Sequence, residues 1–151
     1  KPTATYHEGS VWTYAGNYDI ALPCATQNEI DGDAAKRLVA QGVKVVSEGA
    51  NMPSNIDAIN VYKENGILYG PAKAANAGGV AVSALEMSQN SQRLSWTREE
   101  VDGRLKDIMT NIFNTAKTTA ETYGLGKDYL AGANIAAFEN VANAMIAQGL
   151  V

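Results

Sequence analysis

The sequence predicts an α/β fold in which three parallel strands alternate with helices and a wholly helical segment follows. Two observations predict it. Three short apolar runs alternate with two stretches of helical spacing, an order that produces right-handed crossovers within a parallel sheet. Beyond them only helical patterns remain. We therefore expect one domain, with a βαβαβ unit at about residues 16–79 and a helical part at about residues 80–151.

The predicted strands are short apolar runs of the length and character of buried strands. They cover residues 18–23, 44–48 and 66–70. Two helices connect them. The first, over residues 31–42, opens with the N-cap signal Asp31. The second follows Pro53 and ends at Gly66, which suits a left-handed cap.

Three helices are predicted in the rest of the chain. Residues 80–92 contain no helix-breaking residue. Thr97 and Glu100 form a capping-box pattern that opens a long helix, which Gly124 ends. The last helix covers residues 129–148. Because their apolar residues recur in steps of three and four, we expect these side chains to be buried: Met87, Val101, Leu105, Met109, Ile112, Phe138, Val141 and Met145.

Composition and charge exclude several classes of protein. The chain has 151 residues, of which 46% are hydrophobic and 19% charged, as is typical of a packed globular domain. Its net charge is −4 and its basic residues do not cluster, so we expect no nucleic-acid partner. One cysteine and one histidine cannot complete a tetrahedral zinc site, and we expect no metal.

Two further expectations concern the setting of the chain. No apolar run approaches the length of about 18 residues that a membrane span requires, so we expect no membrane. The single cysteine cannot form an internal disulfide, and we therefore expect a cytoplasmic location. The chain begins at Lys1 and enters a predicted strand soon afterwards. We therefore expect it to be a piece of a longer protein.

Small and neutral polar residues follow each predicted strand. The carboxyl ends of parallel strands share one edge of the sheet, where α/β proteins bind ligands. Thr26, Asn51 and Asn76 each follow a strand and provide donors and acceptors that suit ribose hydroxyls and a carboxamide. Each of them could instead cap a helix. Three such residues at neighbouring strand ends favour a binding site.

The chain has no G-x-G-x-x-G pattern, the pattern that holds a pyrophosphate in the first half of a Rossmann domain. The alternation of strands and helices that it does have is that of the second half. The expected fold is therefore the second half of a Rossmann-like dinucleotide-binding domain, with three parallel strands, followed by C-terminal helices.

Three segments resemble glutamate dehydrogenase of the small hexameric, largely bacterial NADP type: DIALPCATQNE at residues 19–29, EGANMP at 48–53 and KAANAGGVAVS at 73–83. The likeness covers nearly the whole chain apart from about the first fifteen residues. It implies reversible oxidative deamination of L-glutamate to 2-oxoglutarate and ammonium, with NADP or NAD as cofactor. It also implies a homo-oligomer, a hexamer in the full enzyme.

The resemblance places the catalytic lysine and aspartate, and most substrate contacts, in an N-terminal domain outside this sequence. We therefore expect no catalytic residue among these 151 residues and no activity from the chain alone. Lys73 follows the third strand, and we expect it to hold its loop in place rather than to catalyse.

Few residues match the binding motifs of the family. The resemblance implies that Asn51 and Asn76 face the nicotinamide and its ribose. It also implies that Ala25, Thr26 and Gln27 line the wall around the adjacent ribose and pyrophosphate. These five residues are the expected cofactor site.

Val80 and Ser83 are the residues that the resemblance assigns to the amino-acid substrate. They are three positions apart and so share one face of a helix. The first turn of a helix that begins after Gly79 favours an anion, so Ser83 can donate to the distal carboxylate while Val80 packs on the methylenes. The alternative is that the Ser83 hydroxyl bonds to the backbone of its own helix.

Three alternatives stay open. The parent enzyme could use NAD, since the residues that choose between the cofactors lie in the half that is not present here. Its substrate could be a branched or aromatic amino acid, although an apolar substrate would favour an apolar residue over Ser83. The chain could also be a non-catalytic small-molecule-binding module with a half-Rossmann shape.

Overall fold

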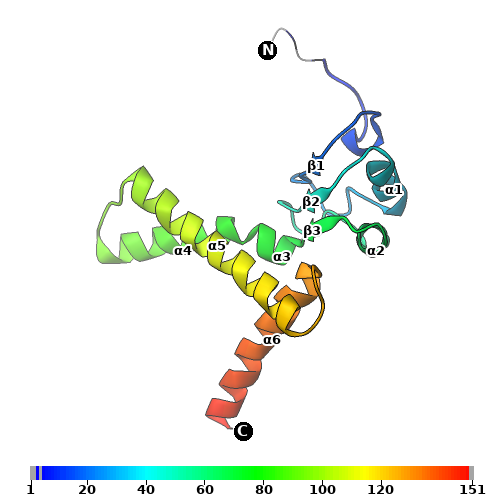
Figure 1. Cartoon of the computed structure of the whole chain (residues 1–151). Coiled ribbons are helices and arrows are strands. Elements are labelled where there is room, and N and C mark those ends of the chain that lie inside the picture. The colour runs from blue at the N-terminus through cyan, green and yellow to red at the C-terminus, as the bar shows by residue number, and fades with distance from the viewer. Residues whose placement is uncertain (1–2, 4, 150–151) are drawn as a thin grey trace.

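The computed structural model describes residue 3 and residues 5–149. They form an α/β part from which long helices extend (Figure 1). After a short 3-10 helix at Val11–Thr13, the α/β part comprises β1 (Ile20–Ala21), α1 (Gly32–Ala40), β2 (Val45–Ser47), α2 (Ile56–Glu64) and β3 (Leu68–Gly70). The helical part comprises α3 (Ala72–Ala75), α4 (Ala77–Gln92), α5 (Arg98–Thr122) and α6 (Tyr129–Gln148). Within these described residues, no helix is long and apolar enough to cross a membrane.

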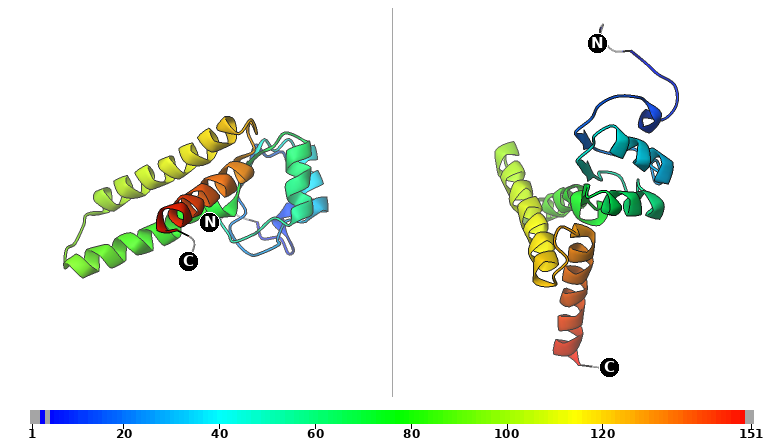
Figure 2. Two further views of the ribbon diagram at one scale, coloured as in Figure 1. Left: turned by 90° about the horizontal axis from the view of Figure 1, so that it is seen from below. Right: turned by 45° about the vertical axis from the view of Figure 1, so that its right-hand side comes forward.

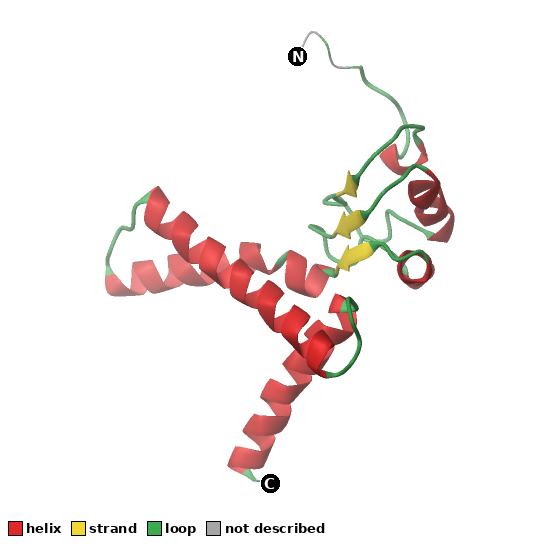
Figure 3. Ribbon diagram, viewed as in Figure 1, coloured by secondary structure: helices red, strands yellow, loops and turns green. Residues whose placement is uncertain are grey.

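The three strands form one parallel sheet in the order β1-β2-β3 (Figure 3). Ile20 pairs with Val45, and Val46 pairs with Tyr69. Parallel neighbours need crossover connections, and α1 and α2 provide them. The predicted α/β class with three parallel strands is confirmed. The first strand, Ile20–Ala21, is shorter at both ends than its apolar run over residues 18–23. At the carboxyl end, Pro23 has no N–H to donate to the ladder.

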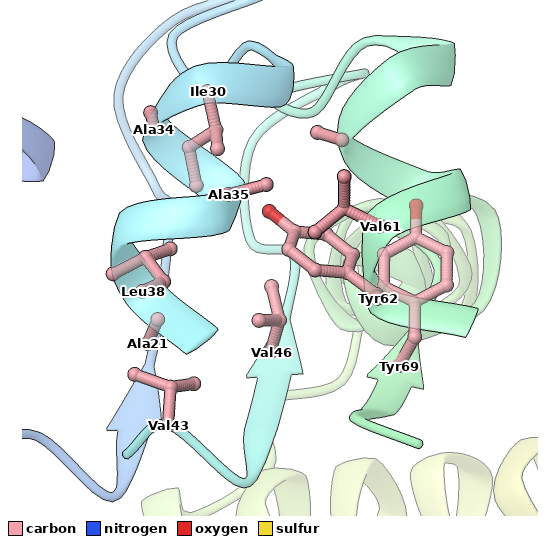
Figure 4. Packing of buried hydrophobic residues seen from close by; sticks show 11 residues of the cluster. Ala21, Ile30, Ala34, Ala35, Leu38, Val43, Val46, Val61, Tyr62 and Tyr69 are labelled. Carbon is pink, nitrogen blue, oxygen red and sulfur yellow. The ribbon is translucent and has the colours of Figure 1, made fainter. Parts of the chain in front are cut away.

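A hydrophobic core fills the space between the sheet and the helices α1 and α2 (Figure 4). Val46 of β2, Ala35 of α1 and Tyr62 of α2 are fully buried in it, together with Ile30. The rings of Tyr62 and Tyr69 pack at a centroid distance of 5.6 Å, within the range in which aromatic pairs attract. This packing holds the carboxyl ends of the strands in a fixed position relative to the helices.

Side-chain caps begin four of the helices. Asp31, Asn55 and Asp128 each accept a hydrogen bond at Oδ1 from the backbone N–H three residues later, at 2.8, 2.9 and 3.0 Å. At the start of α5, Thr97 and Glu100 form the predicted capping box, with bonds of 3.2 and 2.7 Å. The Thr97 backbone and hydroxyl groups lower the pKa of the Glu100 carboxyl. The start predicted for this helix is confirmed.

The chain after β3 differs from the prediction. The short helix α3 has no counterpart among the predicted helices, and α4 begins at Ala77 and not after Gly79. Asn76 both ends α3 and begins α4. An added Cβ on Gly78 would lie 3.1 Å from Leu105 and 3.3 Å from Met109. The glycine therefore permits close packing of α4 on α5, where its sequence pattern predicts a loop.

The apolar faces of the long helices are only partly covered, so their predicted burial is wrong at several positions. Phe138 is 70% exposed and Met87 is 72% exposed, while Val141 and Met145 are each more than half exposed. The physical reason is the arrangement of the helices, which extend away from the α/β part (Figure 2). Both α4 and α6 pack on α5, so much of each apolar face has no neighbour within residues 5–149.

The backbones of α5 and α6 come close together at Gly132. This glycine is buried, and an added Cβ would meet the Ala116 carbonyl oxygen as well as the Ala120 side chain. Both alanines are buried in turn. Small residues on both helices therefore set the distance between them.

Replacing Gly132 by alanine is expected to lower the free energy of unfolding by about 1–3 kcal/mol, because helix backbone has to move to admit the methyl group. Gly103→Ala is the matched control, since Gly103 is exposed in α5 and has open space around its added Cβ. It should raise the free energy of unfolding by about 0.5–1 kcal/mol. Denaturant unfolding measures both. Equal responses would contradict the described contact between α5 and α6.

The N-cap residue of α6 also joins α6 to α2. Asp128 Oδ2 accepts a hydrogen bond from Lys63 Nζ at 2.8 Å. Burial raises the pKa of the Asp128 carboxyl. The Lys63 ammonium and the Ala131 N–H lower it, and together they have the larger effect, so the pKa lies below the ordinary value of 3.8. A carboxyl with a lowered folded pKa adds stability above its unfolded pKa, and this stability is lost as the pH falls through the folded pKa.

Asp128→Asn retains the cap but removes the ion pair, and it should lower the free energy of unfolding at pH 7 by about 0.5–1 kcal/mol. As the pH falls through the folded pKa of Asp128, the difference from the wild type should shrink, because the wild-type carboxyl loses its charge. Asp33→Asn, which removes an exposed pair with Lys36, should change less at pH 7. Chemical denaturation at pH 7 and below the folded pKa of Asp128 measures each effect. A difference for Asp128 that persists on acidification would contradict a role for its charge.

Candidate functional site

The carboxyl ends of β2 and β3 bring Asn51 and Asn76 into contact. The side-chain amide of Asn76 donates to Asn51 Oδ1 at 2.7 Å and to the Ala50 carbonyl at 3.2 Å. Asn51 lies in the loop after β2, and Asn76 lies at the joint between α3 and α4. With these bonds made, the pair still offers the amide N–H groups of Asn51 and the side-chain oxygen of Asn76. That combination complements another primary amide.

A hollow of about 540 Å³ opens beside this pair. Asn51, Asn76 and Met52 line it together with Lys73 and Asn134. Lys73 Nζ donates to Asn134 Oδ1 at 2.6 Å, so the lysine connects α3 to α6. The other predicted site residues do not line this hollow.

The side chain of Glu29 accepts hydrogen bonds from the backbone of the loop after β1. Its Oε1 accepts hydrogen bonds from the backbone N–H groups of Ala25 and Thr26, at 2.9 and 3.2 Å. Its Oε2 accepts one from Trp12 Nε1 at 2.8 Å. Ala25, Thr26 and Gln27 are all exposed. Since the N–H groups of Ala25 and Thr26 already have an acceptor, a ligand would bind to other groups of this loop.

Val80 and Ser83 lie on one face of α4, as their spacing predicts, but not in its first turn. They are the fourth and seventh residues of a helix that begins at Ala77, so its N-terminal N–H groups lie earlier in the chain than expected. The Ser83 hydroxyl donates to the Gly79 carbonyl at 3.2 Å, the intrahelical bond that the alternative interpretation predicts. Val80 is 72% exposed.

Comparison with known proteins gives the family of the chain. The protein-family model described as "Glutamate/Leucine/Phenylalanine/Valine dehydrogenase" matches residues 1–149 of the chain. The chain belongs to this dehydrogenase family. Similar sequences include the NADP-specific glutamate dehydrogenases of Giardia intestinalis, 57% identical over 99% of the chain, and of Salmonella typhimurium, 55% identical over 97%. The chain covers 34% and 32% of these two relatives, about a third of their length.

Solved structures of the dehydrogenase family share the fold. A crystal structure of the Plasmodium falciparum glutamate dehydrogenase has 56% sequence identity and a TM-score of 0.84, over 88% of this chain and 29% of that one. A second glutamate dehydrogenase has 48% identity and a TM-score of 0.87, over 93% of this chain and 31% of that one. The α/β fold predicted from the sequence is therefore a fold of the family.

Two carboxylates of this dehydrogenase-family chain were not predicted as part of the site. Glu29 follows Thr26 at the spacing of a capping box, and that pattern could have indicated its bonds to the loop. Glu48 is 2% exposed, although glutamate is rarely buried without an ionic partner, and no local pattern indicates it. Within the described part of the chain, no group of three or more His, Cys, Asp or Glu residues could hold a metal ion.

Proposed function

We propose that the chain is the C-terminal third of an NADP-linked glutamate dehydrogenase. The longer enzyme would catalyse the reversible oxidative deamination of L-glutamate to 2-oxoglutarate and ammonium. The observation that carries the proposal is the 57% identity, over 99% of the chain, to an NADP-specific glutamate dehydrogenase. The contact between Asn51 and Asn76 supports it, because it lies at the sheet edge where α/β proteins bind ligands.

The cofactor would lie along the carboxyl ends of the strands. Asn51 would donate to the nicotinamide carboxamide and Asn76 would accept from it, which uses the donor and acceptor that their mutual bond leaves. Both side chains are neutral, so neither adds a fixed charge beside a ring that changes charge on reduction. Ala25, Thr26 and Gln27 would border the adjacent ribose and pyrophosphate. When bound, NADP supplies the hydride acceptor and NADPH the donor.

The substrate would contact the exposed face of α4. Ser83 would turn its hydroxyl from the Gly79 carbonyl to the distal carboxylate of L-glutamate or 2-oxoglutarate, and Val80 would pack on the methylenes. The catalytic lysine and aspartate would come from the rest of the longer enzyme. We also propose that this enzyme is a cytoplasmic homo-hexamer that binds neither nucleic acid nor membrane.

Other amino-acid dehydrogenases form the second candidate class. The family description also names leucine, phenylalanine and valine dehydrogenases, and such an enzyme could use NAD. The hydroxyl of Ser83 favours a dicarboxylate over these apolar substrates. A non-catalytic half-Rossmann binding module is less well supported, because the relatives above are named as enzymes.

Kinetic assays of the longer enzyme test the proposal. Purified protein should reduce NADP with L-glutamate, oxidise NADPH with 2-oxoglutarate and ammonium, and show lower kcat/KM with NAD and with L-leucine, L-phenylalanine or L-valine. The 151-residue chain assayed alone should show no turnover, since the acid and base would be missing. Preference for an apolar amino acid would overturn the proposal, as would turnover by the chain alone.

A further inference from the structure

Glu48 is a buried carboxylate at the end of β2. Its side chain is almost completely shielded from water, and among the ion pairs of the described residues none includes it. Burying an ionised group is unfavourable unless hydrogen bonds replace its water. The carboxylate therefore depends on neutral donors of the protein.

Three such donors surround Glu48. Oε2 accepts from the Tyr69 hydroxyl at 2.8 Å and from the Ala72 backbone N–H at 2.8 Å. Oε1 accepts from the Ser54 backbone N–H at 3.2 Å. Burial and the bond to Glu48 raise the pKa of Tyr69, so the tyrosine hydroxyl keeps its proton and remains a donor.

The two backbone donors belong to the two segments that carry the asparagines. Ser54 is three residues after Asn51, and Ala72 is four residues before Asn76. One carboxylate thus binds both segments that carry the pair. The direct bond between Asn51 and Asn76, which is exposed to solvent, joins the same two segments a second time.

We propose that Glu48 is a positioning residue for the nicotinamide end of the cofactor. It fixes the loop after β2 and the start of α3, so that the two asparagine side chains stay in contact and present one donor and one acceptor. This role rests on the proposed function of the chain. Glu48 also lines the hollow beside the pair, but both of its oxygens already accept hydrogen bonds from protein donors. It therefore acts through the two segments that carry the asparagines.

The geometry explains why a carboxylate is needed and an amide would fail. A carboxylate accepts at both oxygens, whereas a glutamine side chain has one acceptor and one donor end. If its oxygen replaced Oε2, its NH₂ group would face the Ser54 N–H. If its NH₂ group replaced Oε2, it would face the Ala72 N–H. In either orientation one segment that carries an asparagine loses its hydrogen bond.

Glu48→Gln in the longer enzyme tests the proposal, with Tyr69→Phe and Glu64→Gln as controls. Tyr69→Phe removes a donor from the same buried carboxylate but leaves both backbone bonds, and Glu64 is an exposed glutamate of α2. Glu48→Gln should lower kcat/KM for NADPH by about 10- to 100-fold, because small misplacement of binding groups has effects of this size. Tyr69→Phe should lower the unfolding temperature and change kcat/KM less than threefold, and Glu64→Gln should change neither.

Ligand binding separates positioning from a general loss of stability. The dissociation constant of NADPH should rise in Glu48→Gln, whereas that of 2′-phospho-ADP-ribose, which lacks the nicotinamide, should stay within twofold. Equal losses for both ligands, or the same loss of kcat/KM in Tyr69→Phe, would overturn the positioning role. An inactive wild type would instead overturn the proposed function, and the positioning role with it.

Hydrogen exchange of the wild-type enzyme provides a test that does not require the variant to fold. The backbone amides of Ser54 and Ala72 should exchange slowly, since both donate to a buried acceptor. Binding of NADPH should slow them further. Exchange of either amide at the rate of an exposed loop would overturn the proposal.

Discussion

Replacing Asn76 by aspartate is expected to lower kcat/KM for NADPH in the longer enzyme by about 30- to 150-fold. The Asn76 amide donates to Asn51 Oδ1 and to the Ala50 carbonyl, and an aspartate would present a carboxylate oxygen to both acceptors. The variant loses two hydrogen bonds of about 1–1.5 kcal/mol each, or about 2–3 kcal/mol together, which corresponds to this fall in rate at about 1.4 kcal/mol per factor of ten. The asparagine pair would separate and the nicotinamide would lose its contacts.

Asn51→Asp adds the same charge to the other asparagine of the pair, but it should lower kcat/KM for NADPH less. The new carboxylate still accepts from Asn76, so only the donor toward the cofactor is lost, and kcat/KM should fall at most about tenfold. Asn90→Asp, at an exposed position of α4, should leave kcat/KM unchanged. Steady-state kinetics with 2-oxoglutarate and ammonium compare the three variants. Equal losses for Asn51→Asp and Asn76→Asp would show that added charge, and not the bond between the asparagines, is responsible.

The order of strands and helices could be predicted because local signals agree with the fold. The caps at Asp31 and Thr97 use side chains within four residues of the bonds they make. At Gly78 the sequence pattern predicts a loop, but the residue lies inside α4. Its neighbour is Leu105 of another helix, and no local pattern shows which helix will pack there. Glycine in a sequence can indicate either a turn or a close contact.

Only those candidate site residues that lie soon after a strand in the sequence could be predicted. Asn51 lies in the loop after β2, and Asn76 follows β3 after the short helix α3, so a parallel sheet brings both to one edge. The carboxylate that binds their segments could not be found in this way, because Glu48 reaches Ala72 across 24 residues. Exposure of the apolar stripe on α6 was also unpredictable, since the sequence shows an apolar face but not which part of the protein covers it.

Replacing Ser83 by valine in the longer enzyme is expected to lower kcat/KM for L-glutamate by about 5- to 13-fold. A hydrogen bond to a charged carboxylate contributes about 1.5–3 kcal/mol. The hydroxyl already donates to Gly79, however, and must give up that bond to reach the substrate. The net loss is therefore about 1–1.5 kcal/mol, which corresponds to the stated fall in rate. L-Valine, which has no distal carboxylate, should lose nothing at this position.

Ser88→Val is the matched control for this prediction. Ser88 lies in the same helix and makes the same kind of bond, to the Ala84 carbonyl at 2.9 Å, but five residues along α4 it lies on a different face. Both variants lose a hydroxyl and gain a β-branched apolar side chain, so they share any cost to the helix. The ratio of kcat/KM for L-glutamate to that for L-valine should fall only in Ser83→Val. A parallel fall in both variants would place the effect in the packing of α4, and an unchanged ratio would remove Ser83 from the substrate site.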